Sequence, residues 1–270
     1  MKYFCCFFCL FISAKCLAQP NCNIYKWKGD SACYKACIEL RDMEDEQGSA
    51  PSQAAFARAV ALCPGLEYAW YEKSVPFLKR GDFITWRKLI DKAVELDPHY
   101  LLERGWCRYK FLRDYEGAIK DIDKLNSLFP VTNCYSGDGD YHINVLKALC
   151  YKGLGEKARA IETIEQQLTV ADYHAKLYDY LHLGVLKLET GDYNGAIAAL
   201  NKEVEVNDYL AETYYYLALA YEQVNNKNGH EKNIRKAREY YDNGKKMTDP
   251  YADPMDKIYL SDIEFEMRKG

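Results

Sequence analysis

The sequence predicts an all-α protein in which about six helix hairpins stack into an α-α superhelix, a right-handed solenoid, with a C-terminal capping helix. Apolar residues recur at helical spacing in paired short segments joined by glycine and aspartate, most clearly in residues 177–208. The paired pattern returns at separations of 34, 32, 42, 36 and 41 residues. One hairpin cannot cover its own apolar side, so the copies are expected to stack against one another.

The clearest hairpin turns at Thr190-Gly191-Asp192. Gly191 can adopt the positive φ that ends one helix, and Asp192 can cap the next. The second helix of each pair is expected to pack closely at one residue, with an apolar residue four positions later. The expected packing residues are Ser52, Trp86, Ala118, Ala160, Ala196 and Ala237.

The N-terminal residues have the pattern of a secretory signal peptide. Lys2 precedes an apolar run that is too short to span a bilayer, and small residues follow near Ala18. We therefore expect residues 1–18 to be a signal peptide, residues 19–29 to be a flexible leader, and the protein to be exported, whether periplasmic, envelope-associated or secreted. A buried first helix is the alternative. Lys15 before Cys16 and Asn21 before Cys22 disfavour a lipid anchor without excluding it.

Export implies an oxidising compartment, in which cysteines form disulfides. Of the 11 cysteines, seven follow residue 18, so at least one would be free or would pair between chains. Cys33 and Cys37 share a helix face, and Cys63 ends the same hairpin. The disulfide candidates are Cys22, Cys33, Cys37 and Cys63, with their connectivity left open.

The solenoid is expected to span residues 30–250, with units at residues 30–64, 67–98, 99–130, 141–172, 177–208 and 211–250. The 42-residue separation marks an inserted loop at residues 131–140. Its Asp138-Gly139-Asp140 lacks the further acids and closing glutamate of a calcium loop, so a plain turn is expected there. Residues 254–269 are predicted to form an amphipathic helix that covers the open end of the stack.

The hairpins resemble the tetratricopeptide repeat, which has a period of about 34 residues. The best match to its pattern is Tyr180-x2-Leu183-Gly184 with Ala196-x3-Leu200. The resemblance covers roughly residues 30–250, although no unit is complete and Ser52 and Trp86 stand where the family has alanine. It implies the superhelix and a role in binding other proteins.

Catalytic signatures are missing from the sequence. There is no GxSxG, no phosphate loop ending in GK[ST] and no HExxH. The five histidines are scattered through different units without a well-placed partner. We therefore expect no enzyme activity, no cofactor and no metal site. Lys and Arg total 36 against 40 Asp and Glu, and no basic tract stands out, so nucleic acid is not an expected partner.

The resemblance also implies that the first helices of the units line a concave groove. The partner-binding candidates at these positions are Tyr68, Tyr71, His142, Tyr178, Leu181 and Tyr215. Packing between units is the alternative role for each. An aromatic groove suits an extended peptide or a helix. We expect a non-catalytic exported module that binds such a segment of a protein partner, whose identity stays open. The alternatives are an envelope assembly accessory that self-associates and, third, a glycan-binding protein.

Overall fold

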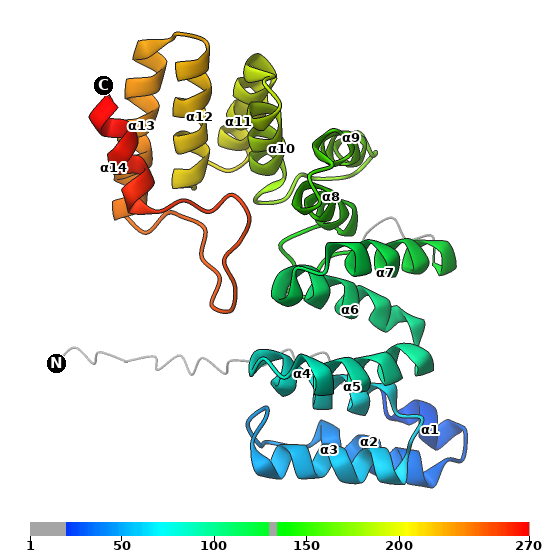
Figure 1. Cartoon of the computed structure of the whole chain (residues 1–270). Coiled ribbons are helices and arrows are strands. Elements are labelled where there is room, and N and C mark those ends of the chain that lie inside the picture. The colour runs from blue at the N-terminus through cyan, green and yellow to red at the C-terminus, as the bar shows by residue number, and fades with distance from the viewer. Residues whose placement is uncertain (1–19, 130–133, 270) are drawn as a thin grey trace, which may run out of the picture.

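The computed structural model describes residues 20–129 and 134–269 (Figure 1). In these ranges the regular structure is helical, apart from one isolated antiparallel bridge between Tyr135 and His142. The predicted signal peptide and the start of the 131–140 loop lie outside the described residues. Among the described helices, none combines the length and the apolar character that crossing a membrane requires.

Helix hairpins follow one another along a curved stack (Figure 1). The pairs are α2 (Ser31–Arg41) with α3 (Ala50–Leu62), α4 (Glu67–Lys79) with α5 (Phe83–Leu96), α6 (Leu101–Cys107) and the π-helix η2 (Arg108–Leu112) with α7 (Tyr115–Leu128), α8 (Ile143–Gly153) with α9 (Lys157–Leu168), α10 (Asp179–Glu189) with α11 (Tyr193–Val206), and α12 (Ala211–Gln223) with α13 (Lys227–Asp242). The remaining helices are α1 (Asn23–Trp27), the 3-10 helix η1 (Pro98–Tyr100) and α14 (Leu260–Lys269). The predicted all-α stack of hairpins is confirmed.

A two-residue signal starts the second helix of every hairpin. A residue with positive φ comes first, and the N-cap residue follows. The pairs are Gly48-Ser49, Gly81-Asp82, Arg113-Asp114, Gly155-Glu156, Gly191-Asp192 and Asn225-Asn226. Except at Glu156, the cap side chain accepts a hydrogen bond from the backbone N–H three residues later, which satisfies a helix-end donor.

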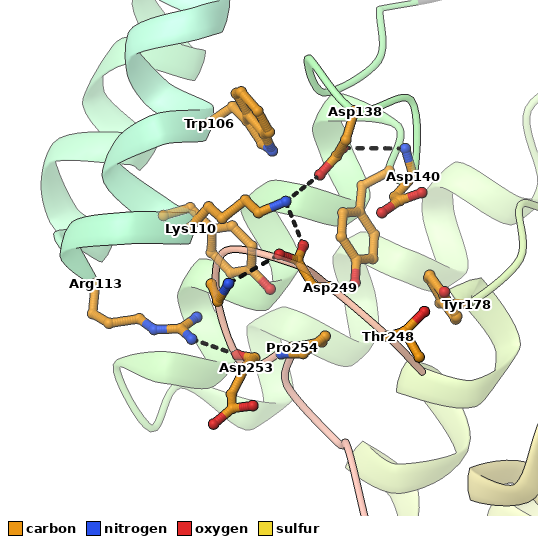
Figure 2. Close-up of a pocket in the computed structure, with 13 residues that line it drawn as sticks. Trp106, Lys110, Arg113, Asp138, Asp140, Tyr178, Thr248, Asp249, Asp253 and Pro254 are labelled. Carbon is orange, nitrogen blue, oxygen red and sulfur yellow. Dashed lines mark hydrogen bonds and ion pairs between the residues drawn. The ribbon is translucent and has the colours of Figure 1, made fainter. Parts of the chain in front are cut away.

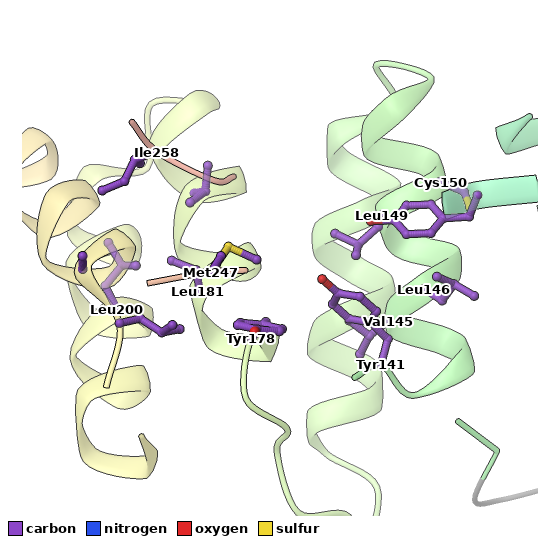
Figure 3. Close-up of a cluster of buried hydrophobic side chains, with 14 of the residues drawn as sticks. Tyr141, Val145, Leu146, Leu149, Cys150, Tyr178, Leu181, Leu200, Met247 and Ile258 are labelled. Carbon is purple, nitrogen blue, oxygen red and sulfur yellow. The ribbon is translucent and has the colours of Figure 1, made fainter. Parts of the chain in front are cut away.

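The six expected packing residues are all buried. Gly184 explains the close contact inside the α10–α11 hairpin, because a Cβ atom there would lie 2.5 Å from Leu200 Cγ. The resulting core runs through the stack from Val145 and Leu149 on α8 to Leu181 on α10 and Leu200 on α11 (Figure 3). Helical periodicity in the sequence therefore identified the packing side of the second helix in each hairpin.

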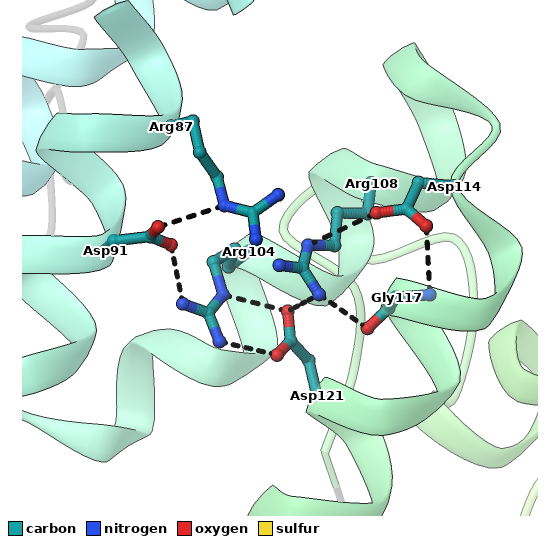
Figure 4. A network of polar contacts seen from close by, with 7 residues as sticks. All are labelled: Arg87, Asp91, Arg104, Arg108, Asp114, Gly117 and Asp121. Atoms are coloured by element: carbon teal, nitrogen blue, oxygen red, sulfur yellow. Dashed lines mark hydrogen bonds and ion pairs between the residues drawn. The ribbon is translucent and has the colours of Figure 1, made fainter. Parts of the chain in front are cut away.

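A buried arginine–aspartate network joins α5 to α7 (Figure 4). Asp121 on α7 accepts hydrogen bonds from Arg104 Nε at 2.9 Å and Arg104 Nη2 at 2.6 Å, and it lies 3.1 Å from Arg108 Nη1. Arg104 also donates to Asp91 on α5 at 2.6 Å. Because Asp121 is only 3% exposed, its charge depends on these two arginines for compensation.

The N-cap residue of α10, Tyr178, makes no side-chain cap hydrogen bond. Glu203 on α11 caps the start of α10 instead. Its Oε2 accepts a hydrogen bond from the Leu181 backbone N–H at 3.1 Å, and its side chain is fully buried. Burial raises the pKa of Glu203 to about 8, against the weaker opposing effect of hydrogen bonds from Asn207 and Leu181. The folded state therefore binds this proton more tightly than the unfolded chain does.

The raised pKa of Glu203 predicts a loss of stability as pH rises. The contribution is fully present below the ordinary carboxyl pKa of about 4.5 and is lost as pH rises to about 8. The slope approaches about 1.4 kcal/mol per pH unit for one proton. Urea unfolding at intervals from pH 5 to 8 measures how the free energy of unfolding changes with pH, with the Glu203→Gln variant as the comparison. The variant is expected to have the shallower pH dependence, and parallel curves would contradict this assignment.

Three boundaries differ from those expected. Residues 19–29 are not simply a flexible leader, since they include α1 and since Cys22 is joined to Cys37 by a disulfide. The last hairpin ends at Asp242 rather than near residue 250. The capping helix begins at Leu260 rather than at residue 254. The two later differences have one cause, because residues 243–259 form a non-helical segment that the helical pattern did not reveal.

Candidate functional site

Residues 245–259 link α13 to α14, and we call them the strap. Figure 1 shows them as an orange-red segment that leaves the hairpin stack, reaches toward α6 and returns to α14. The strap contains two Asp-Pro pairs, Asp249-Pro250 and Asp253-Pro254. Proline has no backbone N–H and interrupts a helix, so this stretch crosses the inside of the arc as extended and turning chain.

Apolar side chains hold both ends of the strap in the core. Met247 and Ile258 are each 2% exposed and belong to the same cluster as Leu181 (Figure 3). Backbone hydrogen bonds reinforce the first end. The Met247 N–H donates to Glu212 Oε1 at 3.1 Å, and the N–H of Ala211 donates to a strap carbonyl at 2.8 Å. The start of α12 thus fixes where the strap enters the arc.

Asp249 forms the anchor at the tip of the strap (Figure 2). Its Oδ1 accepts hydrogen bonds from the N–H groups of Tyr251 at 2.7 Å and Ala252 at 2.9 Å, which folds the tip into a turn. Its Oδ2 pairs with Lys110 Nζ on η2. Burial alone would lower the pKa of Lys110, but hydrogen bonds and charges from Asp249 and Asp138 outweigh it and hold the pKa above its ordinary value.

Asp256 forms the second anchor, on the returning half of the strap. Its two oxygens lie 2.5 Å from Lys152 Nζ on α8 and 2.6 Å from His182 Nδ1 on α10. Burial would raise the pKa of Asp256, but the contacts with His182 and Lys152 prevail and hold it below its ordinary value. Between the two anchors, Arg113 Nη2 donates to the Asp253 carbonyl at 2.5 Å. One extended segment is thus held by four successive hairpins.

Little space remains between the strap and the stack. The cavity enclosed by Trp106, Tyr109, Tyr178 and the strap holds only about 20 Å³, room for about one water molecule (Figure 2). An open cleft of about 410 Å³ lies beside the tip, between Phe83, Phe111 and Tyr251. We call the side of the arc that carries Lys110, Arg113, Lys152 and His182 the inner face. The strap therefore fills the middle of this inner face, while the tip of the strap stays accessible.

The six predicted partner-binding residues do not form one exposed groove. His142 is 1% exposed and caps α8 by accepting from the Asn144 N–H at 3.1 Å, and Leu181 is fully buried in the core, so neither side chain is accessible to a partner in this structure. Tyr178 is also buried, beside the strap. Helical periodicity cannot separate a residue that packs between units from one that faces the groove, which explains why buried residues were among the candidates.

The three remaining candidates are partly exposed. Tyr68 packs against the N-terminal core. The ring of Tyr71 lies 5.0 Å from that of Tyr100, and Tyr215 stands edge-on to Tyr216 at 5.2 Å. Partner binding by these three tyrosines stays a prediction.

The disulfide candidates pair with one another, as Cys22–Cys37 and Cys33–Cys63. Cys107, Cys134 and Cys150 are free, and of these only Cys134 is not buried. These four cysteines are therefore joined inside the chain and leave no thiol between residues 20 and 63 for a bond between copies.

The expected turn around Asp138 is present, and Gly139 has a positive φ of 80°. Asp138 accepts a hydrogen bond from Ser136 Oγ at 2.5 Å and pairs with Lys110 at 3.0 Å. These contacts engage both of its carboxylate oxygens with protein groups. The loop thus supports the inner-face lysine that binds the strap.

Sequence reasoning missed the residues that hold the strap. The missed set is Lys110, Arg113, Lys152, His182, Asp249 and Asp256. The available signal was the pair of Asp-Pro steps between two helical patterns, since prolines there exclude a continuous helix.

Comparisons with known proteins show which proteins share this fold. A family model described as tetratricopeptide repeat matches residues 141–174. No curated protein sequence matches the chain. Among solved structures, a tetratricopeptide repeat protein from Parabacteroides merdae aligns with a TM-score of 0.57 at 13% identity, covering 92% of this chain and 82% of that one.

Two further structures align over most of their own length. PilW, a type IV pilus biogenesis factor, has a TM-score of 0.57 and 14% identity, covering 82% of this chain and 90% of its own. YrrB, described as having an unusual peptide-binding site, has a TM-score of 0.52 and 14% identity, covering 70% and 93%. At these identities the likeness establishes the fold alone. The chain therefore has the fold of tetratricopeptide-repeat structures, and residues 141–174 match the family's own sequence model.

Proposed function

We propose that the protein is a non-catalytic interaction module whose inner face binds an extended acidic segment of a partner protein in place of the strap. The observation that carries this proposal is the strap itself, whose residues 248–256 hold three aspartates and no lysine or arginine and are already seated on that face through Asp249 and Asp256. A surface that holds one such segment has the groups needed to hold another of similar chemistry.

Charge complementarity supports an acidic partner. The chain as a whole has a net charge of −4, yet basic groups from successive inner helices point at the strap. They comprise Lys110, Arg113, Lys152 and His182, together with Lys79, whose ammonium lies 5.1 Å from the ring centre of Tyr251. Charged hydrogen bonds of this kind favour carboxylates over neutral groups.

The strap would compete with a partner segment for the inner face, to which it is tethered by the chain itself. A short tether gives a bound segment a high effective concentration, in the millimolar range, so a partner must bind more tightly than the strap or engage the exposed tip first. The open cleft beside Tyr251, which is 57% exposed, supplies a first contact. Peptide binding is also named for YrrB, whose fold this chain shares.

Export is part of the proposal. The pattern of residues 1–18 predicts secretion, and the two disulfides suit an oxidising compartment. An exported interaction module would meet its partner in the envelope or outside the cell.

A labelled peptide of residues 245–259 tests the proposal directly. The receptor is the full chain with Asp249→Asn and Asp256→Asn, which weakens its own strap and leaves every inner-face basic residue intact. Fluorescence anisotropy should show at least about tenfold tighter peptide binding than to the unmodified chain, because the tethered competitor has been weakened.

Two matched controls accompany this experiment. A peptide carrying both asparagines should bind poorly, and so should a receptor that also carries Lys110→Met and Lys152→Met. Circular dichroism establishes that each receptor keeps its helices. The proposal is rejected if the unmodified and weakened-strap chains bind the peptide equally tightly. It is also rejected if the peptide carrying both asparagines binds as tightly as the peptide with aspartates.

A further inference from the structure

Three metal-ligand side chains meet where α14 covers the end of the stack. Glu222 comes from α12, His230 from α13 and Glu266 from α14. One ligand atom from each lies within 4.8 Å of the other two. Because three different helices supply them, no local sequence motif marks the cluster, and no metal site is expected from the sequence.

Two buried atoms of this cluster have no hydrogen-bond partner. His230 Nε2 and Glu266 Oε2 have none in the described structure, and their residues are 6% and 4% exposed. The two atoms lie 3.9 Å apart, which is beyond hydrogen-bond distance. Leaving such a buried polar atom unpaired costs about 1–3 kcal/mol. The geometry therefore leaves both His230 Nε2 and Glu266 Oε2 available to a ligand that lies between them.

The separation suits a shared cation. Zinc binds imidazole nitrogen and carboxylate oxygen at about 2.0–2.2 Å in tetrahedral geometry, so two of its ligand atoms lie about 3.4 Å apart. His230 Nε2 and Glu266 Oε2 are 3.9 Å apart and need to approach by only about 0.5 Å to reach that separation. Glu222 has a side chain that is 39% exposed, so it can move the short distance needed to complete the site.

The surroundings allow an ion to reach this point. A cleft of about 160 Å³ borders His230 and Glu266, together with Ile234 and Met267. Lys269 is the competing cation, with Nζ 2.8 Å from Glu266 Oε1 and 4.0 Å from Glu222 Oε2. Its side chain is 40% exposed and can swing into solvent when a metal ion takes its place.

We propose that Glu222, His230 and Glu266 bind a divalent transition-metal cation, with Zn²⁺ as the best match to one imidazole and two carboxylates. Water completes the coordination on the exposed side of Glu222. The bound ion clamps α14 onto α12 and α13. This site is separate from the strap-binding face and does not depend on the function proposed for that face.

Calorimetric titration of the chelator-treated full chain with ZnCl₂ tests the site. We expect one Zn²⁺ per chain and a rise in melting temperature that chelator reverses. His230→Gln and Glu266→Gln should each weaken binding at least about tenfold, since even loss of a residue that only orients a ligand costs 10–100-fold. His174→Gln, at an exposed histidine outside the cluster, should leave affinity unchanged.

Lys269→Met provides a variant that should gain affinity. Removing the competing ammonium is expected to tighten Zn²⁺ binding several-fold, which a purely structural role for the cluster would not produce. Co²⁺ gives a second readout through visible absorption bands that His230→Gln should abolish. The proposal is overturned if the chain binds no Zn²⁺, if His230→Gln binds it as tightly as the unmodified chain, or if Lys269→Met shows no gain.

Discussion

Replacing Asp121 with alanine is expected to lower the free energy of unfolding by about 3–5 kcal/mol. Asp121 is buried between Arg104 and Arg108, whose side chains are 15% and 7% exposed. Without the carboxylate, two largely desolvated guanidinium groups face each other with reduced compensation. Arg104 keeps Asp91, but Arg108 is left mainly with the carbonyl of Gly117 and a 3.6 Å contact to Asp114 (Figure 4).

Urea unfolding followed by circular dichroism measures this effect. Asp123→Ala is the matched control on the same helix, since Asp123 is 52% exposed and forms a surface ion pair with Lys147. Its cost should stay within about 1 kcal/mol. If the two variants lose the same stability, the buried network does not hold α5–α7 together as described.

Replacing Asp256 with alanine is expected to cost about 3 kcal/mol, at the lower end for a broken buried ion pair. Lys152 and His182 are 10% and 0% exposed in their side chains, and both lose their strap partner. The cost is moderated because Lys152 retains Glu189 at 3.2 Å. The same substitution should strengthen binding of the strap peptide, because the tethered competitor has lost an anchor.

Equilibrium unfolding and peptide anisotropy on the same Asp256→Ala protein separate strap release from general damage. Asp253→Ala is the control within the strap, since its carboxylate is 67% exposed and pairs only with strap residues Lys257 and Tyr259. It should change neither quantity appreciably. Loss of stability in Asp256→Ala without any gain in peptide binding would mean that the strap does not compete for the inner face.

The hairpins could be predicted because their determinants are local. Gly191 and Asp192 specify a turn and a cap within two residues, and Ala196 and Leu200 show the packing side through their four-residue spacing. The same turn at Arg113 and Asn225 uses residues other than glycine with φ of 54° and 57°, so its sequence signal is weaker. Even there the period of the repeat places the second helix.

The strap could not be predicted in the same way because its contacts are distant in sequence. His182 and Asp256 are 74 residues apart, and Arg113 and Asp253 are 140 apart. Such pairs form only after the stack has curved enough to present its inner face. The metal-ligand cluster has the same origin, because Glu222 and Glu266 meet only when α14 docks.

A double-mutant cycle between Lys110 and Asp249 tests most directly whether the strap occupies the inner face in solution. Lys110→Met, Asp249→Asn and the double variant are compared with the unmodified chain by urea unfolding. The contact of Lys110 with Asp138 is lost in both arms of the cycle and cancels. A seated strap predicts a coupling energy of about 1–3 kcal/mol between the two residues, whereas additivity within about 0.5 kcal/mol would show that they do not meet and would contradict the account.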